Sequence, residues 1–338
     1  MLSSVQEPLI SILLPARNAE ATLGDALESI LAQTWVNWEL VLVNDGSVDG
    51  TPEIAHRYAR QDPRIKVHRA GGDGITSALR IAAMHARGEY LARMDADDIA
   101  LPDRLERQIA ALQDNPRAAV CGGRVEDFGE VGEGRRRYSA WLNSLDSPEE
   151  IARNLFVECP LAHPTFLMRG SAFRAVGGYE SRPWPEDYDL LLRFWLNGYE
   201  LTTTPPPPIL RWRDSPHRLS RRDPHYAPEA FLACKMHYLL QAPMLLRKRL
   251  VQWGAGLVGK QWLRAWPPER KPELLVDIDP RKIGQRIHGI AVVEPETLGA
   301  PKGRFCVIAV GVGEARPQIR EWLDSHGWAE LADYVFVA

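Results

Sequence analysis

The first 94 residues of the chain alternate apolar runs with segments of helical periodicity. The apolar runs have the length and flanking turn residues of buried strands, and the segments between them repeat apolar residues every three or four positions. In chain order we expect a strand over 9–14, a helix over 19–33, a strand over 38–43, a helix over 51–60, a strand over 65–68, a helix over 74–87 and a strand over 90–94. This alternation predicts an α/β domain with a doubly wound, mainly parallel sheet. In such a sheet, ligands bind at the carboxyl ends of the strands.

The fourth expected strand ends in three carboxylates, Asp95, Asp97 and Asp98. Asp95 and Asp97 are two positions apart, so on an extended backbone they point to the same side. Hard oxygen ligands at such a position suit Mg²⁺ or Mn²⁺. The alternative is a solvated acidic turn, or a helix cap in which Asp98 or Asp103 begins the next helix. Because Asp45 also follows an expected strand, we expect these carboxylates to face one crevice.

Composition narrows the functional class. The 338 residues carry a formal net charge of −3, so no overall positive field recruits nucleic acid. The four cysteines form no C-x-x-C pair, which argues against a zinc site or a disulfide framework. No basic leader precedes the first apolar run, and no run reaches the length of a membrane span. We therefore expect a cytoplasmic protein.

The middle of the chain mixes shorter elements. We expect a pair of strands within 118–128, an exposed glycine-rich turn over 129–137 and a helix over 148–156. A further amphipathic helix is expected over 186–197, and an edge strand over 209–213.

Near residue 251 the strand and helix pattern begins again. Gly254, Gly256 and Gly259 form G-x-G-x-x-G after a short strand, and Asp279 stands twenty residues after Gly259. This arrangement resembles the first βαβ unit of a Rossmann domain that binds a nucleotide. Only about half the length of a full dinucleotide domain remains, so we favour a Rossmann-like accessory unit without a nucleotide. The alternatives are NAD(H) or a nucleotide sugar bound at these residues, and in the simplest case the glycines serve only tight turns.

These patterns predict three segments. Residues 1–227 form the first α/β domain, 228–250 a helical linker and 251–338 the accessory domain.

Several motifs in the first 220 residues occur together in a known order. They are Ile10–Glu20 (ISILLPARNAE), Val43–Thr51 (VNDGSVDGT), Gly74–Leu79 (GITSAL), Ala92–Asp98 (ARMDADD), Pro102–Leu105 (PDRL), His163–Thr165 (HPT), Gly177–Tyr179 (GGY) and Glu186–Arg193 (EDYDLLLR). In order and spacing they resemble the inverting nucleotide-sugar glycosyltransferases of family 2, which have the GT-A fold with a mixed, mainly parallel sheet.

The resemblance implies a role for each matching position. Donor contacts are implied for Pro15, Ala16, Arg17, Asn18, Glu20, Asp45, Asp95, Ala96 and Asp97. Asp97 is implied to hold Mg²⁺ or Mn²⁺ on the diphosphate, Asp187 to be the catalytic base, and Glu186 to shape the site around it. Arg213 and His217 are implied to belong to a loop that closes over the diphosphate, and the alternative for them is a solvated basic loop.

The implied activity is transfer of one sugar from a nucleotide-diphosphate sugar, with a UDP-sugar favoured, to a glycan or glycolipid hydroxyl in cell-surface polysaccharide synthesis. Such a role brings the protein to the inner face of the membrane. Arg80 departs from the family, in which asparagine is usual, and the Q-x-x-R-W motif of processive synthases is missing. A sugar nucleotidyltransferase and a non-catalytic nucleotide-sugar-binding protein are the alternatives. The former needs a phosphate loop rich in glycine and lysine, which Leu14–Asn18 is not.

Overall fold

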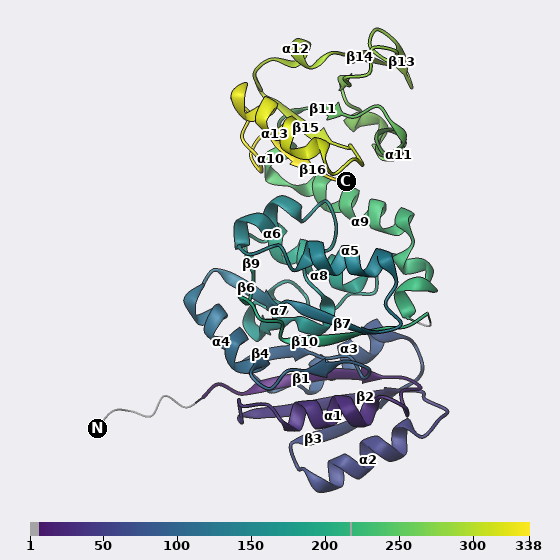
Figure 1. The fold of residues 1–338 in the computed structure, drawn as a ribbon, viewed down its shortest axis with the longest axis vertical. Helices are drawn as coiled ribbons and strands as arrows, with labels where there is room; N and C mark the ends of the chain where they lie inside the picture. Colours follow the sequence, from purple (N-terminus) through teal and green to yellow (C-terminus); the bar gives the residue numbers. More distant parts are fainter. Residues whose placement is uncertain (1–6, 217) are drawn as a thin grey trace, which may run out of the picture. The chain divides into compact units, whose positions relative to one another are not determined.

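The structure is a computed structural model that describes residues 7–216 and 218–338. The chain divides into two compact units, Met1–Pro148 with Pro160–Asp223, and Glu149–Cys159 with Pro224–Ala338 (Figure 1). Within the described ranges, no helix combines the length and the apolar character needed to span a bilayer.

The first unit contains a seven-stranded sheet of order β3-β2-β1-β4-β8-β6-β9. Strands β1 to β4 are parallel, and β8 is antiparallel to both β4 and β6. The elements of this unit are β1 (Ile10–Ala16), α1 (Leu23–Leu31), β2 (Trp38–Asp45), α2 (Thr51–Gln61), β3 (Ile65–Ala70), α3 (Ile75–His85), β4 (Tyr90–Arg93), β5 (Ile99–Ala100), α4 (Arg104–Asp114), β6 (Ala118–Gly122), β7 (Val125–Gly129), α5 (Glu133–Leu142), η1 (His163–Thr165), β8 (Leu167–Arg169), α7 (Gly170–Ala175), α8 (Glu186–Leu196), β9 (Glu200–Thr203), β10 (Leu210–Asp214) and η2 (Leu219–Arg221). The expected doubly wound, mainly parallel α/β sheet is confirmed.

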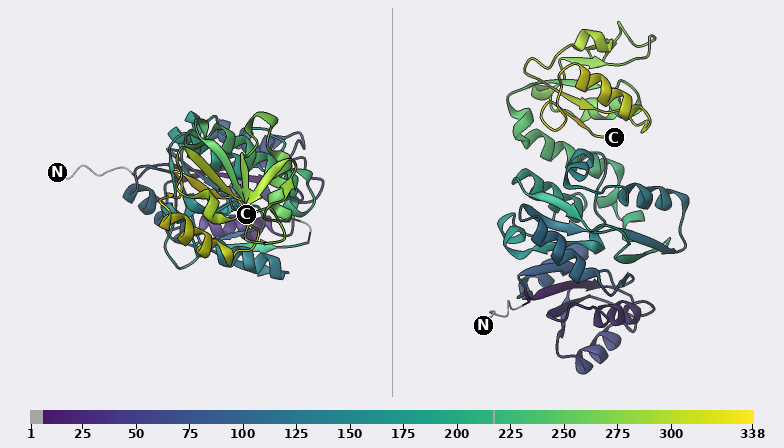
Figure 2. Two further views of the ribbon diagram at one scale, coloured as in Figure 1. Left: turned by 90° about the horizontal axis from the view of Figure 1, so that it is seen from above. Right: turned by 60° about the vertical axis from the view of Figure 1, so that its left-hand side comes forward.

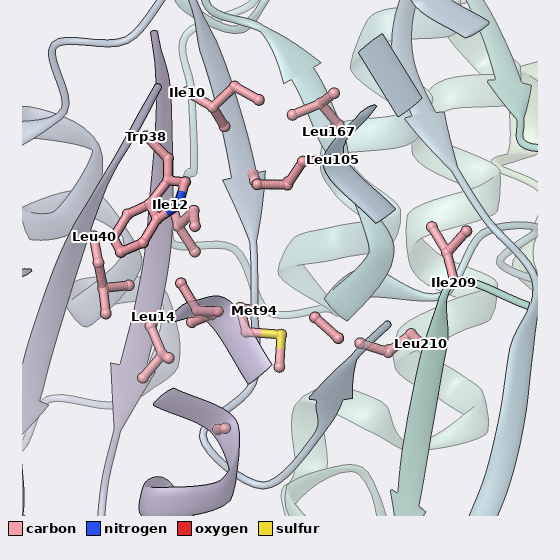
Figure 3. Close-up of a cluster of buried hydrophobic side chains, with 14 of the residues drawn as sticks. Ile10, Ile12, Leu14, Trp38, Leu40, Met94, Leu105, Leu167, Ile209 and Leu210 are labelled. Atoms are coloured by element: carbon pink, nitrogen blue, oxygen red, sulfur yellow. The ribbon is translucent and has the colours of Figure 1, made fainter. Parts of the chain in front are cut away.

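Alternation along β1 divides the core of this unit between the two faces of the sheet. Ile10, Ile12 and Leu14 belong to the cluster that packs against α1, α2 and α4, and Figure 3 shows them with neighbours from β2 and with Met94, which follows β4. Leu13 points to the opposite face, where α3 contacts β1 and β2. The sheet is therefore covered on both faces, which leaves the strand ends as the places where ligands can reach it.

The three-stranded sheet has the order β5-β10-β7, so β10 is its middle strand. Leu210 pairs with Ala100 on one side and with Val125 on the other. The expectation of an edge strand at 209–213 is therefore wrong, because both partners come from distant parts of the chain.

Two further expectations for the middle of the chain also fail. β6 and β7 do not pair with each other, since they lie in different sheets. The glycine-rich segment expected to be an exposed turn contains the start of α5, which buries Ser139 and Leu142 against the unit.

The second unit contains a six-stranded sheet of order β13-β14-β12-β11-β15-β16, in which every neighbouring pair except β13 with β14 is parallel. Helices α11 and α13 cover opposite faces, because Leu263 packs with Leu275 and Leu323 packs with Val276 (Figure 2). The elements are α6 (Pro148–Asn154), η3 (Pro224–Tyr226), α9 (Pro228–Gln241), α10 (Pro243–Leu246), β11 (Arg249–Trp253), α11 (Leu257–Ala265), η4 (Pro268–Arg270), β12 (Leu274–Val276), β13 (Arg286–Ile287), β14 (Ile290–Val293), α12 (Pro295–Leu298), β15 (Arg304–Ile308), α13 (Ala315–Ser325) and β16 (Tyr334–Phe336).

The second unit extends beyond the range 251–338 that the sequence patterns assign to an accessory domain. It includes α9, which the sequence analysis places in a linker, and residues 149–159. The Lys235 ammonium of α9 donates to the Val157 carbonyl at 2.7 Å and to the Val337 carbonyl at 3.4 Å. These bonds tie the three segments into one unit.

The turn before β4 leaves no space for a side chain at Gly88. A Cβ atom there would lie 2.5 Å from the Ser11 backbone nitrogen and 2.7 Å from the Tyr90 carbonyl oxygen. We expect Gly88→Ala to lower the free energy of unfolding by about 2 kcal/mol or more, because rigid backbone must move. Urea unfolding measures this. The control Gly134→Ala, where the added atom has open space, should stay within about 1 kcal/mol of wild type. Equal losses in the two variants would contradict the packing argument.

Candidate functional site

Three neighbouring parallel strands bring polar residues to one edge of the seven-stranded sheet. β1 lies between β2 and β4 and is parallel to both, so their carboxyl ends share this edge. Arg17 and Asn18 follow β1, Asp45 is the last residue of β2, and the acidic run from Asp95 follows β4. The same edge receives the start of β8, because β8 is antiparallel to β4.

The loops after β1 and β2 hold each other through side chains. The Asn18 backbone N–H donates to Ser47 Oγ at 3.0 Å, and Asn18 Oδ1 accepts from the Val48 N–H at 3.0 Å. Glu20 Oε2 accepts from the Gly50 N–H at 2.7 Å. Both expected donor-contact residues therefore have a defined place in the loop framework.

The Asp45 carboxylate is almost fully buried and bonds the loop that precedes α3. Its two oxygens accept from the N–H groups of Gly72 at 2.9 Å and Gly74 at 3.0 Å, and Arg17 Nη1 lies 3.7 Å away. The neighbouring Asn44 closes the turn after β2, because its Oδ1 accepts from the Ser47 N–H at 3.1 Å. Asp45 thus positions the 72–74 loop, and each of its oxygens keeps a lone pair for a further bond.

The three carboxylates after β4 lie close together. One ligand oxygen from each of Asp95, Asp97 and Asp98 lies within 4.8 Å of the others. Burial raises the pKa of Asp97 to about 6, and the neighbouring Asp95 charge adds to this. The pKa of Asp98 is raised for the same two reasons, and Asp97 adds to the effect. The cluster therefore contains more negative charge than its surroundings stabilise.

This cluster fits a hard divalent cation. All of its donor atoms are carboxylate oxygens, and the buried Asp98 Oδ2 has no hydrogen-bond partner in the described structure. Mg²⁺ and Mn²⁺ prefer such ligands and keep positions open for water or phosphate oxygens. A bound cation would offset the repulsion that raises the pKa of Asp97.

Arg213 supports the acidic run from β10. Its backbone N–H donates to Asp98 Oδ1 at 2.8 Å, and its Nε donates to the Asp97 carbonyl at 2.8 Å. Its guanidinium also lies 4.4 Å above the Phe128 ring. In this arrangement the Arg213 side chain holds the backbone of Asp97, while its expected contact with a donor stays a prediction. His217, the other expected loop residue, lies outside the described residues.

Arg218 belongs to the same basic loop as Arg213, and from the sequence it could equally be solvated. Its Nη1 donates to the Arg213 carbonyl at 3.2 Å, and its guanidinium lies 4.8 Å above the Trp212 ring. Its charge lowers the pKa of Asp95 and opposes the rise at Asp97. Arg218 is therefore close enough to the acidic cluster to act on it.

The second acidic group stands at the start of α8. Asp187 Oδ1 accepts from the Tyr188 N–H at 2.7 Å, and burial followed by the Glu186 charge raises the pKa of Asp187 to about 6. Glu186 Oε1 lies 3.5 Å from His163 Nδ1, and His163 Nε2 lies 2.9 Å from the Tyr179 hydroxyl. Asp187 is thus a carboxyl group held among polar neighbours and more basic than usual.

Asp189 has a different place, although it belongs to the same acidic turn. Its oxygens accept from Trp184 Nε1 at 2.7 Å and from Arg193 Nε at 2.8 Å. Arg193 in turn donates to the Val176 carbonyl at 2.6 Å. This buried network anchors the start of α8 and so fixes where Asp187 points.

Arg93 interacts with both acidic groups. It is 1% exposed, forms an ion pair with Asp95, and lowers the pKa of both Asp95 and Asp187. Burial lowers the pKa of Arg93 itself, but Asp95, Tyr179 and Glu186 raise it above its usual value. His163 also lowers the pKa of both Asp95 and Asp187. The two acidic groups, about ninety positions apart in the chain, therefore act on the same buried cation.

The glycine motif of the second unit has packing roles. A Cβ on Gly259 would lie 2.0 Å from the Gly254 carbonyl oxygen, and Gly254 has a φ of +108°. Gly256 has open space around the Cβ position. Asp279 bonds Arg281, while Asp277 Oδ2 accepts from the Ala255 N–H at 2.9 Å. Tight packing accounts for Gly254 and Gly259, and a nucleotide at this loop stays an alternative to the favoured unit without one.

Comparisons with known proteins find relatives that match mainly the first unit of the chain. The model of the family "Glycosyl transferase family 2" matches residues 11–177. The putative glycosyltransferase EpsE of Bacillus subtilis is 38% identical over 197 residues, which cover 57% of this chain and 68% of that protein. The amylovoran biosynthesis glycosyltransferase AmsE of Erwinia amylovora is 30% identical over 200 residues, covering 58% and 73%. The crystal structure of S. aureus TarS 1–349 in complex with UDP-GlcNAc has a TM-score of 0.57 at 18% identity, covering 69% of this chain and 67% of that one.

The interaction of Arg93 with both acidic groups can be tested directly. We expect Arg93→Met to raise the pKa of Asp187 further above its usual range, because a nearby positive charge is lost. Carboxyl ¹³C NMR titration measures this value. In the control Arg169→Met, the lost guanidinium bonds the backbone carbonyls of Ala118 and Leu112, so the Asp187 titration should not move. An unchanged Asp187 pKa in Arg93→Met would show that the two acidic groups are not linked through this cation.

Proposed function

The chain belongs to glycosyl transferase family 2, and from this premise we propose that it transfers one sugar per encounter with inversion at the anomeric carbon. The donor is a nucleotide-diphosphate sugar, with a UDP-sugar favoured, and the acceptor is a hydroxyl of a glycan or glycolipid. The observation that carries the proposal is that both acidic groups lie near the buried Arg93, which forms an ion pair with Asp95 and also lowers the pKa of Asp187. Inverting transfer needs positive charge at the departing diphosphate, which a cation held by one acidic group can supply, and a second carboxylate that takes the proton of the incoming alcohol.

The nucleotide binds at the carboxyl ends of β1 and β2. The backbone of Pro15–Asn18 holds it, with Glu20 and Asp45 close by and Asp95 with Ala96 on the side of the ribose and sugar. The bonds from Asn18 to Ser47 and from Asp45 to Gly72 support this proposal, because they fix the loops before any ligand arrives. A loop that is already ordered loses less conformational entropy on binding.

Asp97 is the proposed ligand of Mg²⁺ or Mn²⁺, with Asp95 and Asp98 beside it. When bound, the cation offsets the negative charge that develops on the leaving diphosphate without any proton transfer. Arg218 adds a positive charge near the same carboxylates, as its effect on the pKa of Asp97 indicates. Arg213 contributes by holding the Asp97 backbone in place.

Asp187 is the proposed base. In an inverting reaction the acceptor oxygen attacks the face opposite the leaving group, so its proton must leave on that side. With a pKa of about 6, Asp187 is mostly ionised at pH 7 and is still a stronger base than an ordinary carboxylate. The His163 side chain, between Glu186 and Tyr179, orients this end of the site.

The name of one relative supports the proposed acceptor class. This relative is by name a glycosyltransferase of amylovoran biosynthesis, which supports a cell-surface polysaccharide as the product of this chain's reaction. A glycan acceptor presents hydroxyl groups, which suit a carboxylate base of raised pKa.

Asp187→Asn should separate proton removal from donor binding. The amide keeps the shape of the side chain but cannot accept the acceptor's proton, so transfer should fall by about 10²- to 10⁴-fold. The dissociation constant for UDP with Mn²⁺, measured by calorimetry, should change less than about threefold. The control Asp103→Asn changes a half-exposed carboxylate at the start of α4 and should keep full activity. Full transfer activity in Asp187→Asn would remove this residue from the role of base.

Asp97→Ala should instead weaken donor binding, and only when the metal is present. Calorimetry with UDP- and GDP-sugars, each with and without Mn²⁺, should show loss of the metal-dependent part of the affinity because the cation has lost its ligand. Asp114→Ala, at the exposed end of α4, is the matched control and should bind as wild type does. If no nucleotide sugar binds the wild-type protein under any of these conditions, the donor proposal is wrong.

A further inference from the structure

A hollow of the first unit lies away from the proposed donor edge. It has a volume of about 410 Å³ and is bordered by α2, β3 and the end of α3. Glu39 and Ile65, at its floor, stand near the starts of β2 and β3, whereas the acidic groups stand at the carboxyl ends of the strands. This hollow, called the groove below, is therefore separate from the proposed donor site.

Its polar lining is mainly basic or titratable, with His56, Lys66, His68, His85 and Arg87 opposed by Glu39. The buried Glu39 carboxylate is already engaged. It accepts from Ser11 Oγ at 2.7 Å and from Arg87 Nε and Nη2 at 2.8 and 2.6 Å. The charges of Glu39 and Arg87 therefore cancel, and Lys66 supplies the net charge of the groove.

The remaining basic side chains have no acceptor. Within residues 7–216 and 218–338, the side chains of His56, Lys66, His68 and His85 make no hydrogen bond and no ion pair. The rings of His68 and His85 are stacked, with centroids 3.9 Å apart and planes 18° apart. Burial and His85 together lower the pKa of His68, since two stacked imidazolium ions would repel each other. An anion beside the stacked rings would offset that repulsion.

Lys66 alone has a simpler explanation. β3 is the edge strand of its sheet, and lysine on an edge strand discourages pairing with another chain. That function does not require three histidines from α2, β3 and α3 around one hollow.

We propose that this groove binds the phosphate group of a small molecule. A phosphate offers several acceptor oxygens, so it can satisfy an ammonium and more than one imidazole at once. The volume lies in the range of small-molecule sites and exceeds the needs of a bare ion. Ala59, Ile65 and Val67 complete the lining with apolar atoms at the edge of the sheet. The assignment is independent of the proposed transfer reaction.

Imidazole ¹⁵N NMR of the full chain during titration with inorganic phosphate tests the proposal. We expect saturable shifts of the His56, His68 and His85 signals. In Lys66→Gln/His85→Gln, which changes two exposed side chains, the apparent affinity reported by His68 should fall at least tenfold. Lys260→Gln/His288→Gln makes the same changes at exposed positions of the second unit and should leave it unchanged. His163 reports separately on phosphate at the donor edge.

Absence of a saturable shift at His68, or an equal affinity in the Lys66→Gln/His85→Gln variant, would overturn the proposal. Phosphatidylcholine vesicles with and without phosphatidic acid form a second arm. Co-sedimentation that requires phosphatidic acid in the vesicles, and that is lost in the Lys66→Gln/His85→Gln variant, would assign the phosphate to a lipid headgroup. Saturable shifts without such co-sedimentation assign it to a soluble molecule.

Discussion

Repulsion among carboxylates at the end of β4 is the constraint on which the rest of the site depends. Asp95, Asp97 and Asp98 crowd together at a partly buried place, and the Arg93 guanidinium offsets part of their charge. Arg93 is itself fixed through its backbone, since its N–H donates to the Phe166 carbonyl at 2.8 Å and its carbonyl accepts from Arg104 Nη2 at 2.6 Å. This buried cation neutralises only part of the charge of the three carboxylates. The cluster therefore stays net negative, while the repulsion within it is reduced.

The scaffold places the acidic groups by pairing distant segments. The Asp98 carboxylate accepts a hydrogen bond from a backbone N–H of β10. The buried Asp189–Arg193 pair anchors the helix that carries Asp187. Asp45 holds the 72–74 loop in the same way. For Asp98 and Asp189, one carboxylate of an acidic motif serves the fold and leaves its neighbour for the proposed chemistry. This division explains why both motifs contain more acidic residues than the proposed reaction uses.

Local periodicity predicted the helices and strands, which depend on residues close together in the chain. The alternating strands and helices to Arg93 follow from apolar spacing, and the shared edge follows from parallel strands. Long-range pairing could not be predicted, as the central place of β10, the separation of β6 from β7 and the inclusion of residues 149–159 in the second unit show. Arg93 gave a signal that was missed, because an arginine inside an otherwise apolar strand needs a buried partner. Nothing in the sequence distinguished Arg218 from a solvated residue, since a basic loop is usually solvated.

Paramagnetic broadening by Mn²⁺ tests most directly whether both acidic groups face one site. On adding Mn²⁺ and UDP, the account predicts strong broadening of the His163 imidazole signals, because His163 lies beside Glu186 and acts on both Asp95 and Asp187. Asp97→Ala should abolish that broadening. Sharp His163 signals in a sample whose Mn²⁺ is bound would place the metal away from Asp187 and contradict the account.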